Sequence, residues 1–385
     1  MADPAGPRRV PGASLEATPE TVRGDGRPPT RLTLLYIVGH HRSGGTALGA
    51  VLASEPTIFF AGELYRFPDP IWSSGDGGRG CSCGAPVLAC PFWNEVRRAA
   101  EARDLLGALS RGQRRFERWA ALPRLLMRPG AGRRERLTHV RAMAEFAGII
   151  ARTSGAQVLV EYGPSAARAR IVRELSAFGV NVRYLHLVRD GRGFLASELG
   201  TLSDPEAPGD WVRNPIIVLA RWIAMNLAAI VLCGGDRSRY RRVRYEDLLA
   251  DPRTTLTRIG ELLGTDLSAV LARVEAGDRI PMRHIAAGNR ARLKREIVLD
   301  RTPTRLPRLP RATRLLFWAS AGWLAGPLGY RPGRAARPPG TQGWTGRLVR
   351  RLPRIVHRLA GLDRHRSSVD PASGGPSASA GVGKP

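Results

Sequence analysis

A short apolar run that ends in a glycine-rich turn restricts the fold more than any other feature of the chain. Residues 32–38 read LTLLYIV, and Gly39 follows directly. An apolar run of this length, bounded by glycine, is typical of a parallel strand that is buried on both faces. We expect the turn to lead into a helix over residues 46–54. Such a strand–turn–helix unit indicates an α/β protein.

The alternation of strand and helix continues along the chain. Elements in this order form a parallel sheet with right-handed crossovers. We therefore expect a three-layer α/β fold around a central parallel sheet, in which the glycine-rich turn after Val38 would form the P-loop. Further strands are expected at residues 57–60, 157–161, 182–188 and 241–244, and further helices at 166–178, 214–233 and 251–263, with one more that ends near 200.

Changes in composition divide the chain into three parts. Residues 1–31 are rich in proline, glycine and charge, which predicts a disordered leader. Residues 32–330 carry the α/β pattern. Within them, residues 93–150 alternate arginine with apolar residues at helical spacing, as expected of a helical lid or subdomain beside a substrate site. Residues 331–385 form a basic tail rich in proline and glycine, and we expect its end to be disordered.

The basic tail contains an amphipathic stretch over residues 346–362. Its apolar residues recur at alternating spacings of four and three, beside arginines. The pattern is typical of a helix on an anionic membrane surface, and equally of a helix that covers the domain's own core. Pro353 would kink either one. The apolar residues are Leu348, Leu352, Ile355, Leu359 and Leu362.

The formal net charge of +27 raises the question of a polyanionic partner. Almost every cation is arginine, and alanine, glycine and proline are abundant, so GC-rich coding accounts for part of the charge. A surface for single-stranded nucleic acid combines clustered cations with stacking aromatics. Aromatic residues make up only 6% of this chain, and its arginines are spread along the whole length. We expect no specific nucleic-acid partner, and a non-catalytic polyanion-binding or membrane-surface protein is the weaker alternative.

Targeting and membrane segments are not predicted. The leader has no apolar core of the kind that a secretory signal needs. The most apolar stretch, residues 216–233, approaches the length of a membrane span but is interrupted by Arg221 and Asn226. Its composition fits a buried core helix better. The expected location is cytoplasmic, with peripheral contact to an anionic inner membrane face through the basic tail.

The turn after the first strand has the spacing of a phosphate-binding loop. Residues 39–46 read GHHRSGGT, a G-x4-G-x-T pattern in which Gly45 occupies the Walker lysine position. Kinases and NTPases use that lysine to reach the β- and γ-phosphates, so its loss disfavours the alternative of a P-loop kinase or other NTP-binding protein. The backbone N–H groups and the helix N-terminus still favour an anion. Arg42 supplies the fixed positive charge.

A second anion site is expected after the strand at residues 182–188. Arg189 follows this strand, and Ser197 comes eight residues later, about two turns into the next helix. An arginine and a hydroxyl at this separation can converge on one anion. The loops after parallel strands emerge at one edge of the sheet, where α/β proteins bind their ligands.

Taken together, these features resemble the P-loop sulfotransferases that use 3′-phosphoadenosine 5′-phosphosulfate (PAPS), in particular a bacterial branch related to the carbohydrate and tyrosylprotein enzymes. The family's 5′-phosphosulfate loop commonly reads R-S-G-T-T. Arg42, Ser43, Gly44 and Thr46 match it, whereas Gly45 replaces a hydroxyl residue with a backbone donor only.

The resemblance implies further contacts with the donor. It assigns Arg189 and Ser197 to the ribose 3′-phosphate, the group that distinguishes PAPS from ordinary nucleotides. The family segment R-Y-E-D-L recurs here with Tyr245, which implies a contact with the adenine.

The resemblance also extends to a loop near the end of the domain. Residues 284–292 read HIAAGNRAR and are similar to the C-terminal loop that closes over the 3′-phosphate in many members. A basic side chain in this loop would add charge to the 3′-phosphate site. This implies a cofactor-binding role for Arg290 or Arg292.

Transfer to an alcohol needs a base for the hydroxyl proton and cations for the charge that develops on the leaving phosphate. Arg42 is the expected cation. Glu63 follows the second strand in a G-E dipeptide, which resembles the proposed base of the carbohydrate and tyrosylprotein enzymes. This carboxylate could instead pair structurally with Arg42 or Arg66. His41 is the rival base within the loop, and the neighbouring His40 is a further departure from the family.

Two positions on the other strands complete the candidate polar residues. Glu161 stands where many bacterial relatives read D-S-S-K, and the family lysine is missing here. Glu161 remains a candidate for a second polar group. His186 lies in the middle of a predicted strand and is expected to be a buried core histidine.

Three of the four cysteines lie close together in the sequence. Cys81, Cys83 and Cys90 form a C-x-C-x6-C pattern, similar to a stretch in a subset of bacterial sulfotransferases. Three thiolates can bind zinc, but no histidine or fourth cysteine stands near them in the sequence. A chain of this length does not need disulfides to fold. We therefore expect a loop element without a metal.

The sequence thus predicts an enzyme that moves a sulfuryl group from PAPS to a hydroxyl acceptor by in-line displacement. Carbohydrates, glycolipids and small metabolites all carry such a hydroxyl. PAPS is the expected co-substrate, and no metal cofactor is expected.

Overall fold

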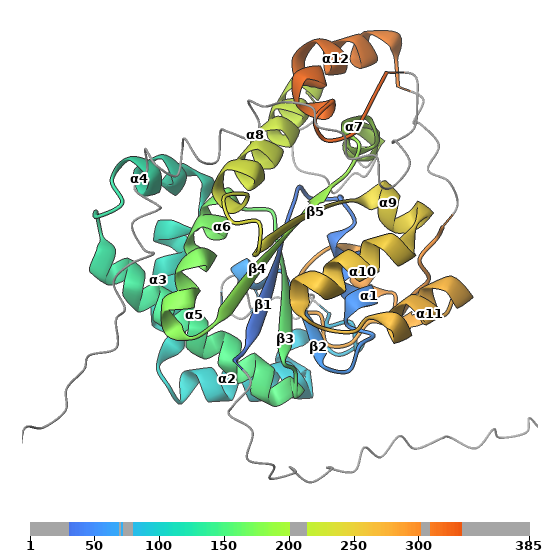
Figure 1. Ribbon diagram of the computed structural model, residues 1–385. Coiled ribbons are helices and arrows are strands. Elements are labelled where there is room, and N and C mark those ends of the chain that lie inside the picture. Colours follow the sequence, from blue (N-terminus) through green and yellow to red (C-terminus); the bar gives the residue numbers. More distant parts are fainter. Residues whose placement is uncertain (1–30, 69–70, 72–79, 201–213, 302–308, 333–385) are drawn as a thin grey trace, which may run out of the picture. The chain divides into compact units, whose positions relative to one another are not determined.

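The structure of the protein is a computed structural model that describes residues 31–68, 71, 80–200, 214–301 and 309–332. Its centre is a five-stranded sheet in which all pairings are parallel and the order is β2-β3-β1-β4-β5. Helices lie on both faces of this sheet (Figure 1), which confirms the expected α/β fold. The strands are β1 (Thr33–Val38), β2 (Ile58–Gly62), β3 (Val158–Gly163), β4 (Asn181–Val188) and β5 (Tyr240–Arg244).

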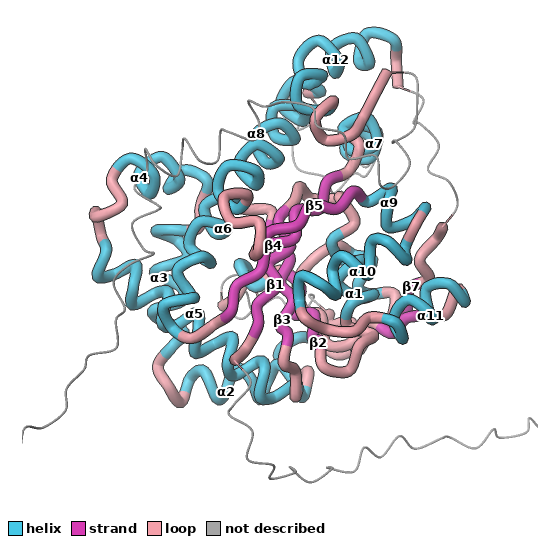
Figure 2. Tube along the Cα trace, in the orientation of Figure 1, coloured by secondary structure: helices cyan, strands magenta, loops and turns pink. Residues whose placement is uncertain are grey.

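Each face of the sheet has its own hydrophobic core, because successive side chains of a strand point to opposite faces. In β1, Leu34 and Tyr36 belong to one core, and Leu35 and Ile37 belong to the other. The first core is covered by α2 (Pro91–Glu101), α3 (Leu105–Phe116), α4 (Leu122–Met127), α5 (Arg133–Ser154) and α6 (Ala166–Val172). The second is covered by α1 (Gly45–Leu52), α9 (Tyr245–Ala250), α10 (Pro252–Leu263) and α11 (Ser268–Ala276) (Figure 2).

The helices α2 to α5 occupy the segment between β2 and β3. They correspond to the part of the chain in which arginine alternates with apolar residues. Their apolar stripes face the sheet: Trp93 of α2, Leu109 of α3 and Phe146 of α5 are all buried in the first core. Most arginines of these helices are exposed, as expected of amphipathic surface helices, whereas Arg136 of α5 is buried and pairs with Glu174.

A third apolar cluster lies beyond β4, among α7 (Gly191–Gly200), α8 (Pro215–Cys233) and α12 (Arg311–Ala325). Trp222, Phe317 and Tyr330 are fully buried in it. Among the described helices, α8 alone is long and apolar enough to cross a membrane, with a mean hydropathy of 2.2. Half of it is buried within the protein, where it packs on α6, α7, α12 and β4.

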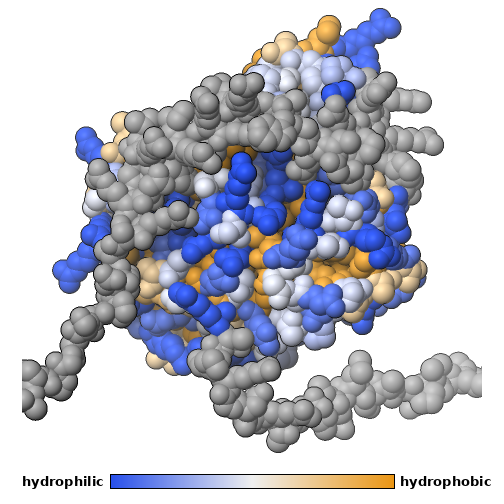
Figure 3. All heavy atoms as spheres, viewed as in Figure 1, coloured by the Kyte–Doolittle hydropathy of each residue, from blue (hydrophilic) through white to orange (hydrophobic). Residues whose placement is uncertain are grey.

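Several elements were not expected from the sequence. They are the helices α9, α11 and α12 and a small antiparallel pair formed by β6 (Ile280–Pro281) and β7 (Glu296–Ile297). Residues 1–30 of the leader and residues 333–385 of the basic tail, with the amphipathic stretch at 346–362, fall outside the described residues. Hydrophilic side chains are spread over the face seen in Figure 3 rather than gathered into one patch.

The carboxyl ends of the strands form the edge at which the candidate site lies. β1 and β4 are neighbours in the sheet, with Val38 opposite His186. The chain leaves β1 toward β2 on one side and leaves β4 toward β5 on the other, so the order of the strands reverses between them. In open α/β sheets, ligands bind beyond the carboxyl ends at such a switch point.

Candidate active site at the carboxyl edge of the sheet

The residues predicted to form the site, both for donor binding and for catalysis, come together because each follows a strand of the same parallel sheet. The loop at 39–46 follows β1, Glu63 follows β2, Arg189 follows β4 and Tyr245 follows β5. Contacts between these segments, described below, bring the four strand ends into one site.

The loop after β1 turns sharply into α1. Arg42 and Gly44 adopt left-handed backbone conformations, with φ of 62° and 91°, and the N–H of Ser43 donates to the carbonyl of His40 at 3.2 Å. Gly44 caps α1 without a side-chain hydrogen bond to the first turn. The N–H groups of this first turn, together with the helix dipole, favour an anion here.

The packing around the loop explains why residue 45 has no side chain. A Cβ atom at this position would lie 2.5 Å from the ring of Tyr162, which stands near the end of β3. The Tyr162 hydroxyl donates to the carbonyl of His40 within the loop. The tyrosine ring therefore fills the space that a larger residue 45 would need, and at the same time it supports the loop.

Tyr245 packs directly against the loop from the other side. Its ring lies where a Cβ atom on Gly44 would be, so residue 44 must be glycine for this contact as well as for its positive φ. The guanidinium carbon of Arg189 lies 5.4 Å from the centre of the same ring. Tyr245 thus contacts both predicted anion sites.

Arg189 connects the end of β4 to the phosphate loop. Its Nη1 donates to the carbonyl of Arg42 at 2.7 Å. Its Nε is buried and has no hydrogen-bond partner among the described residues. A buried charged donor without a partner costs about 1–3 kcal/mol, which an anion would offset. Ser197 is half-buried on the following helix, α7.

The segments that carry Arg189 and Tyr245 are tied together behind the site. The Glu246 carboxylate accepts the N–H of Asp190 at 2.9 Å and the Tyr330 hydroxyl at 2.9 Å. Arg244 and Asp247 form a two-point ion pair with bonds of 2.8 and 2.5 Å. These contacts fix the start of α9 against the end of β4.

The Arg42 side chain is paired within the protein. Its Nε lies 3.1 Å from Oε1 of Glu198 on α7. Burial raises the pKa of Glu198, although Arg42 beside it acts in the opposite direction. An anion in the loop would therefore compete with Glu198 for this guanidinium.

Glu63 is buried and held by its two neighbours in the sequence. Its Oε2 accepts Nε of Arg66 at 2.7 Å and the Tyr65 hydroxyl at 2.8 Å. The second oxygen, Oε1, lies 3.9 Å from the position a Cβ atom would take on Gly288. Of the two structural partners considered for Glu63, the structure shows Arg66 and not Arg42.

The two loop histidines are in different surroundings. Burial, together with His41, lowers the pKa of His40 to about 3, and the His40 ring packs on Phe194 with ring centres 4.1 Å apart. His41 reaches the solvent, but the protein around it desolvates the ring and lowers its pKa, while Glu63 acts in the opposite direction. Both histidines are therefore neutral at pH 7. His41 is the one that an acceptor could approach.

The loop at residues 284–292 packs against the site beside Glu63 and Thr46. The carbonyl of Ala287 accepts the N–H of Glu63 at 3.3 Å, and a Cβ atom on Gly288 would lie 3.7 Å from Oγ1 of Thr46. Arg292 is buried, and its guanidinium donates to the carbonyl of Gly288 at 3.1 Å. Arg292 therefore stabilises the loop in this structure. The side chain of Arg290 lies outside the described part of the structure.

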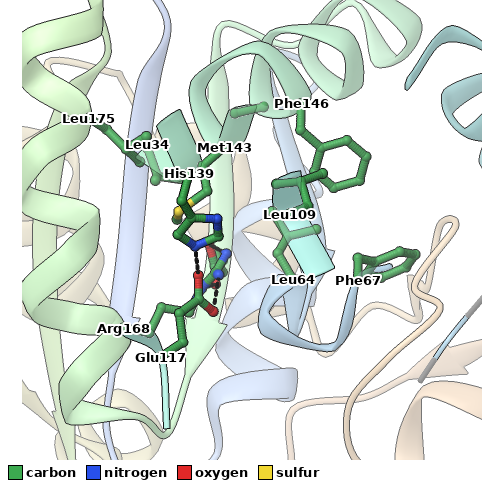
Figure 4. A pocket seen from close by; sticks show the side chains of 12 residues that line it. Leu34, Leu64, Phe67, Leu109, Glu117, His139, Met143, Phe146, Arg168 and Leu175 are labelled. Carbon is green, nitrogen blue, oxygen red and sulfur yellow. Dashed lines mark hydrogen bonds and ion pairs between the residues drawn. The ribbon is translucent and has the colours of Figure 1, made fainter. Parts of the chain in front are cut away.

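Glu161 does not reach the site. It faces the opposite side of the sheet, where Arg168 binds it through Nη2 at 3.1 Å and binds Glu117 through Nη1 at 2.6 Å. Oε1 of Glu117 also accepts a hydrogen bond from Nε2 of His139 at 2.7 Å (Figure 4). Burial alone would raise the pKa of Glu117, but Arg168 and His139 lower it to about 2. This cluster borders a cavity of about 20 Å³, room for roughly one water molecule.

His186 lies where expected, in the core. It is fully buried in β4, with its ring nitrogens 2.8 Å from the Tyr240 hydroxyl and 3.0 Å from Oδ1 of Asn226. Burial lowers its pKa to about 3, so it is neutral at pH 7.

The expectation that the clustered cysteines lack a fourth ligand is wrong. His284, from the loop after β6, lies with Cys81, Cys83 and Cys90 in one group whose four ligand atoms are all within 4.8 Å of one another. The Sγ of Cys90 is 3.3 Å from Nδ1 of His284. No sequence pattern indicates this contact, because the two residues are 194 positions apart.

Three other residues of the site were missed in the sequence. Tyr162, Tyr65 and Glu198 carry no motif, and their roles follow from packing. Tyr162 fills the space beside Gly45, Tyr65 donates to Glu63, and Glu198 pairs with Arg42. The absence of a side chain at position 45 was the one available signal, since it leaves room for a neighbour.

Comparisons with known proteins give the following result. No protein-family model and no curated protein matches the chain. Solved structures that are similar to it include the sulfotransferase domain of the Synechococcus PCC 7002 olefin synthase, with 20% identity and a TM-score of 0.42 over 76% of this chain and 97% of that one. The sulfotransferase domain of the curacin biosynthetic pathway has 16% identity and a TM-score of 0.41 over 78% and 98%.

A third similar structure is the sulfotransferase STF9 from Mycobacterium avium, with 12% identity and a TM-score of 0.38 over 77% of both chains. These values describe a distant likeness of fold. The chain is structurally similar to bacterial sulfotransferase domains over about three quarters of its length.

Proposed function

We propose that this chain is an enzyme that transfers a sulfuryl group from PAPS to a hydroxyl acceptor. The observation that carries the proposal is Arg189, whose buried Nε has no partner among the described residues while its Nη1 contacts the phosphate loop. Two anion-binding elements at adjacent strand ends suit a donor with two separate phosphate groups. An ordinary nucleoside triphosphate would need only one of them, and the Walker lysine for its γ-phosphate is absent.

The residues present fit the donor. The N–H groups at the start of α1 and the guanidinium of Arg42 would hold the 5′-phosphosulfate, for which Arg42 must part from Glu198. Arg189 and Ser197 would hold the 3′-phosphate. Tyr245 packs on the phosphate loop at Gly44 and lies under the guanidinium of Arg189, in keeping with a contact to the adenosine.

In the reaction that we propose, the acceptor oxygen attacks sulfur and the bond between sulfur and the bridging phosphate oxygen breaks. The products are the sulfate ester and adenosine 3′,5′-bisphosphate. The acceptor proton passes to a base, and the negative charge that develops on the leaving phosphate is held by Arg42 and the loop N–H groups.

Glu63 is our candidate for the base. It lies at the end of β2 beside Thr46 and Gly288, and both of its donors bind Oε2, so Oε1 is the oxygen that can receive the proton. Arg66 and Tyr65 also fix its orientation, as a general base requires. His41 is the second candidate, since it is neutral at pH 7 and accessible to solvent.

The acceptor is proposed only as a class. A carbohydrate, a glycolipid or a small metabolite would offer the hydroxyl, and the helices between β2 and β3 would shape its pocket. We further propose a cytoplasmic enzyme whose basic tail contacts an anionic membrane, which would favour a glycolipid. No specific nucleic-acid partner is proposed.

The test is transfer of radiolabelled sulfate from PAPS into lipid, carbohydrate and small-molecule fractions of a cell extract. The wild type should label at least one fraction. Glu63→Gln should bind adenosine 3′,5′-bisphosphate with unchanged affinity and reduce transfer by at least about a hundredfold, the lower range for a general base. Glu135→Gln, which removes an exposed carboxylate paired with Arg115, is the matched control and should remain active.

Two other results would change these assignments. If Glu63→Gln retains near-normal turnover, Glu63 is not the base, and His41→Ala becomes the variant that should abolish transfer. If the wild type binds the bisphosphate no better than ATP, the donor proposal is wrong.

A further inference from the structure

The cluster of Cys81, Cys83, Cys90 and His284 lies outside the candidate active site. Their four ligand atoms fall within 4.8 Å of one another, although they come from segments that are far apart in the sequence. Cys81 and Cys90 are buried, His284 is half-buried and Cys83 is exposed. Three soft thiol ligands and one imidazole are a donor set typical of a structural zinc site.

The distances agree with a tetrahedral ion. With a Zn–S bond of about 2.3 Å, two sulfurs of a regular tetrahedron are about 3.8 Å apart, and a sulfur and a nitrogen are about 3.5 Å apart. In the protein, Sγ of Cys83 and Sγ of Cys90 are 3.7 Å apart, and Sγ of Cys90 and Nδ1 of His284 are 3.3 Å apart. Only small side-chain adjustments separate this arrangement from that of a bound ion.

A tight turn positions the first two cysteines. The N–H of Cys81 donates to the carbonyl of Ala85 at 2.8 Å, and the N–H of Gly84 donates back to the carbonyl of Cys81 at 2.9 Å. Gly84 has a φ of 95°, which side-chain-bearing residues rarely adopt. The turn therefore brings Cys81 and Cys83 together before any ligand binds.

The histidine is held in place from two sides. Its ring stacks on Phe92 with centres 5.1 Å apart and an angle of 11°, and its carbonyl accepts Nε1 of Trp93 at 2.7 Å. Ser82 connects the cysteine turn to the same loop, because its N–H donates to the carbonyl of Ile285 and its Oγ accepts the N–H of Ile285 at 2.7 Å. Preorganised ligands of this kind are what a structural metal site requires.

The charge near the cluster also suits a metal–thiolate group. Zinc with three thiolates and a neutral imidazole has a net charge of −1. Nη2 of Arg295 lies 3.1 Å from the position a Cβ atom would take on Gly84, at the edge of the cysteine turn. Its positive charge would offset the negative charge of the loaded site.

We propose that this chain binds one zinc ion through Cys81, Cys83, Cys90 and His284. On binding, the three thiols lose their protons to solvent and His284 remains neutral, so each ligand offers one electron pair to the ion. The site is structural, because four protein ligands leave no open position for a substrate.

The ion would link the segment before α2 to the loop that borders the catalytic residues. That loop continues from His284 to Ala287, whose carbonyl accepts the N–H of Glu63, and to Gly288 beside Thr46. Zinc would therefore hold the loop against the candidate base without touching the substrate. The metal site rests on its own geometry and does not depend on the proposed sulfuryl transfer.

The experiment measures zinc in the full-length chain, expressed without a histidine tag and kept reduced. Mass spectrometry of the metal should find about one zinc per chain, and replacement by cobalt should give the visible absorption of a tetrahedral thiolate complex. Cys83→Ser should weaken zinc binding by more than a hundredfold in competition with a chromophoric chelator, a larger loss than removal of an outer-shell partner causes. Since Cys83 is exposed, the substitution should leave the fold intact, and circular dichroism checks this.

Two further variants make the result specific. His284→Gln should also lose the ion, and the cobalt spectrum of any residual complex should change. Cys233→Ala removes the one cysteine outside the cluster and should bind zinc like the wild type. The proposal is overturned if the reduced wild type takes up no zinc, if Cys83→Ser binds it unchanged, or if the purified chain carries iron instead. A Cys83–Cys90 disulfide that persists in reductant would also overturn it.

Because metal content is measured without donor or acceptor, its failure is distinct from failure of the transferase proposal. A chain with zinc and no affinity for the bisphosphate would contradict only the transferase. A chain without zinc that transfers sulfate would contradict only the metal site.

Discussion

Replacement of Arg189 by alanine tests whether this residue binds the 3′-phosphate of the donor. In the proposed complex, Nε, which has no partner among the described residues, and the remaining N–H groups of this guanidinium would contact the 3′-phosphate. Each charge-assisted hydrogen bond is worth about 1.5–3 kcal/mol, and about 1.4 kcal/mol corresponds to a tenfold change in affinity. Loss of one or two such bonds, about 1.5–6 kcal/mol, should raise the dissociation constant of adenosine 3′,5′-bisphosphate by roughly tenfold to ten-thousandfold.

The assay is isothermal titration calorimetry of the bisphosphate. Arg189→Lys keeps the charge but loses the planar fork, so its affinity should fall between those of the wild type and Arg189→Ala. Arg183→Ala is the matched control: Arg183 lies on the same strand but near its amino end, where its Nε donates to the carbonyl of Leu262 at 3.1 Å. This variant should bind the bisphosphate like the wild type.

One effect could mimic the predicted loss. Arg189 also donates to the carbonyl of Arg42, so its removal could loosen the phosphate loop. Titration with adenosine 5′-phosphate, which lacks the 3′-phosphate, separates the two causes. If Arg189 contacts the 3′-phosphate, its removal should weaken the bisphosphate far more than the monophosphate. A folded Arg189→Ala protein that binds the bisphosphate within twofold of the wild type would refute the assignment.

Three further outcomes follow from the packing and the buried charges. Gly45→Thr should weaken bisphosphate binding, because its Cβ would lie 2.5 Å from the Tyr162 ring. Adding Tyr162→Ala should restore part of the affinity in the same titration. If it restores none, the clash with Tyr162 is not the cause. Arg168→Met should cost about 3–5 kcal/mol in urea unfolding, because it leaves buried carboxylates such as Glu161 without their cation; a loss below 1 kcal/mol would contradict this. The pKa of His186 falls to about 3 on folding. As the pH drops below about 6.5, the unfolded chain therefore binds a proton that the folded chain does not, and the free energy of unfolding decreases. Between pH 6.5 and pH 4 this decrease is about 3 kcal/mol. His186→Gln should remove it; an unchanged pH dependence of unfolding would contradict the buried, neutral state of His186.

The parts of the fold that could be predicted are those with a local pattern. The apolar run before Gly39 and the run before Arg189 each became a buried parallel strand, because both faces of the sheet are covered. No local pattern predicts that these two strands pair with each other, as β1 and β4 do in the structure. The short helix that begins at Tyr245 was missed, since six residues carry too little periodicity to recognise.

The parts that could not be predicted depend on contacts between distant segments. His284 meets Cys90 across 194 positions, and no spacing rule connects them. Glu161 lies one residue before Tyr162 on β3, and the alternation of the strand sends the two side chains to opposite faces. A sequence without a known register cannot tell which of them faces the site.

The most direct test of the central claim compares ligands by calorimetry on the wild-type chain. Adenosine 3′,5′-bisphosphate, ATP and a short single-stranded DNA are titrated at the same ionic strength. We expect the bisphosphate to bind with one site per chain and at least tenfold more tightly than ATP, because only the bisphosphate presents a 3′-phosphate to Arg189. Tighter binding of ATP or of DNA would contradict the account.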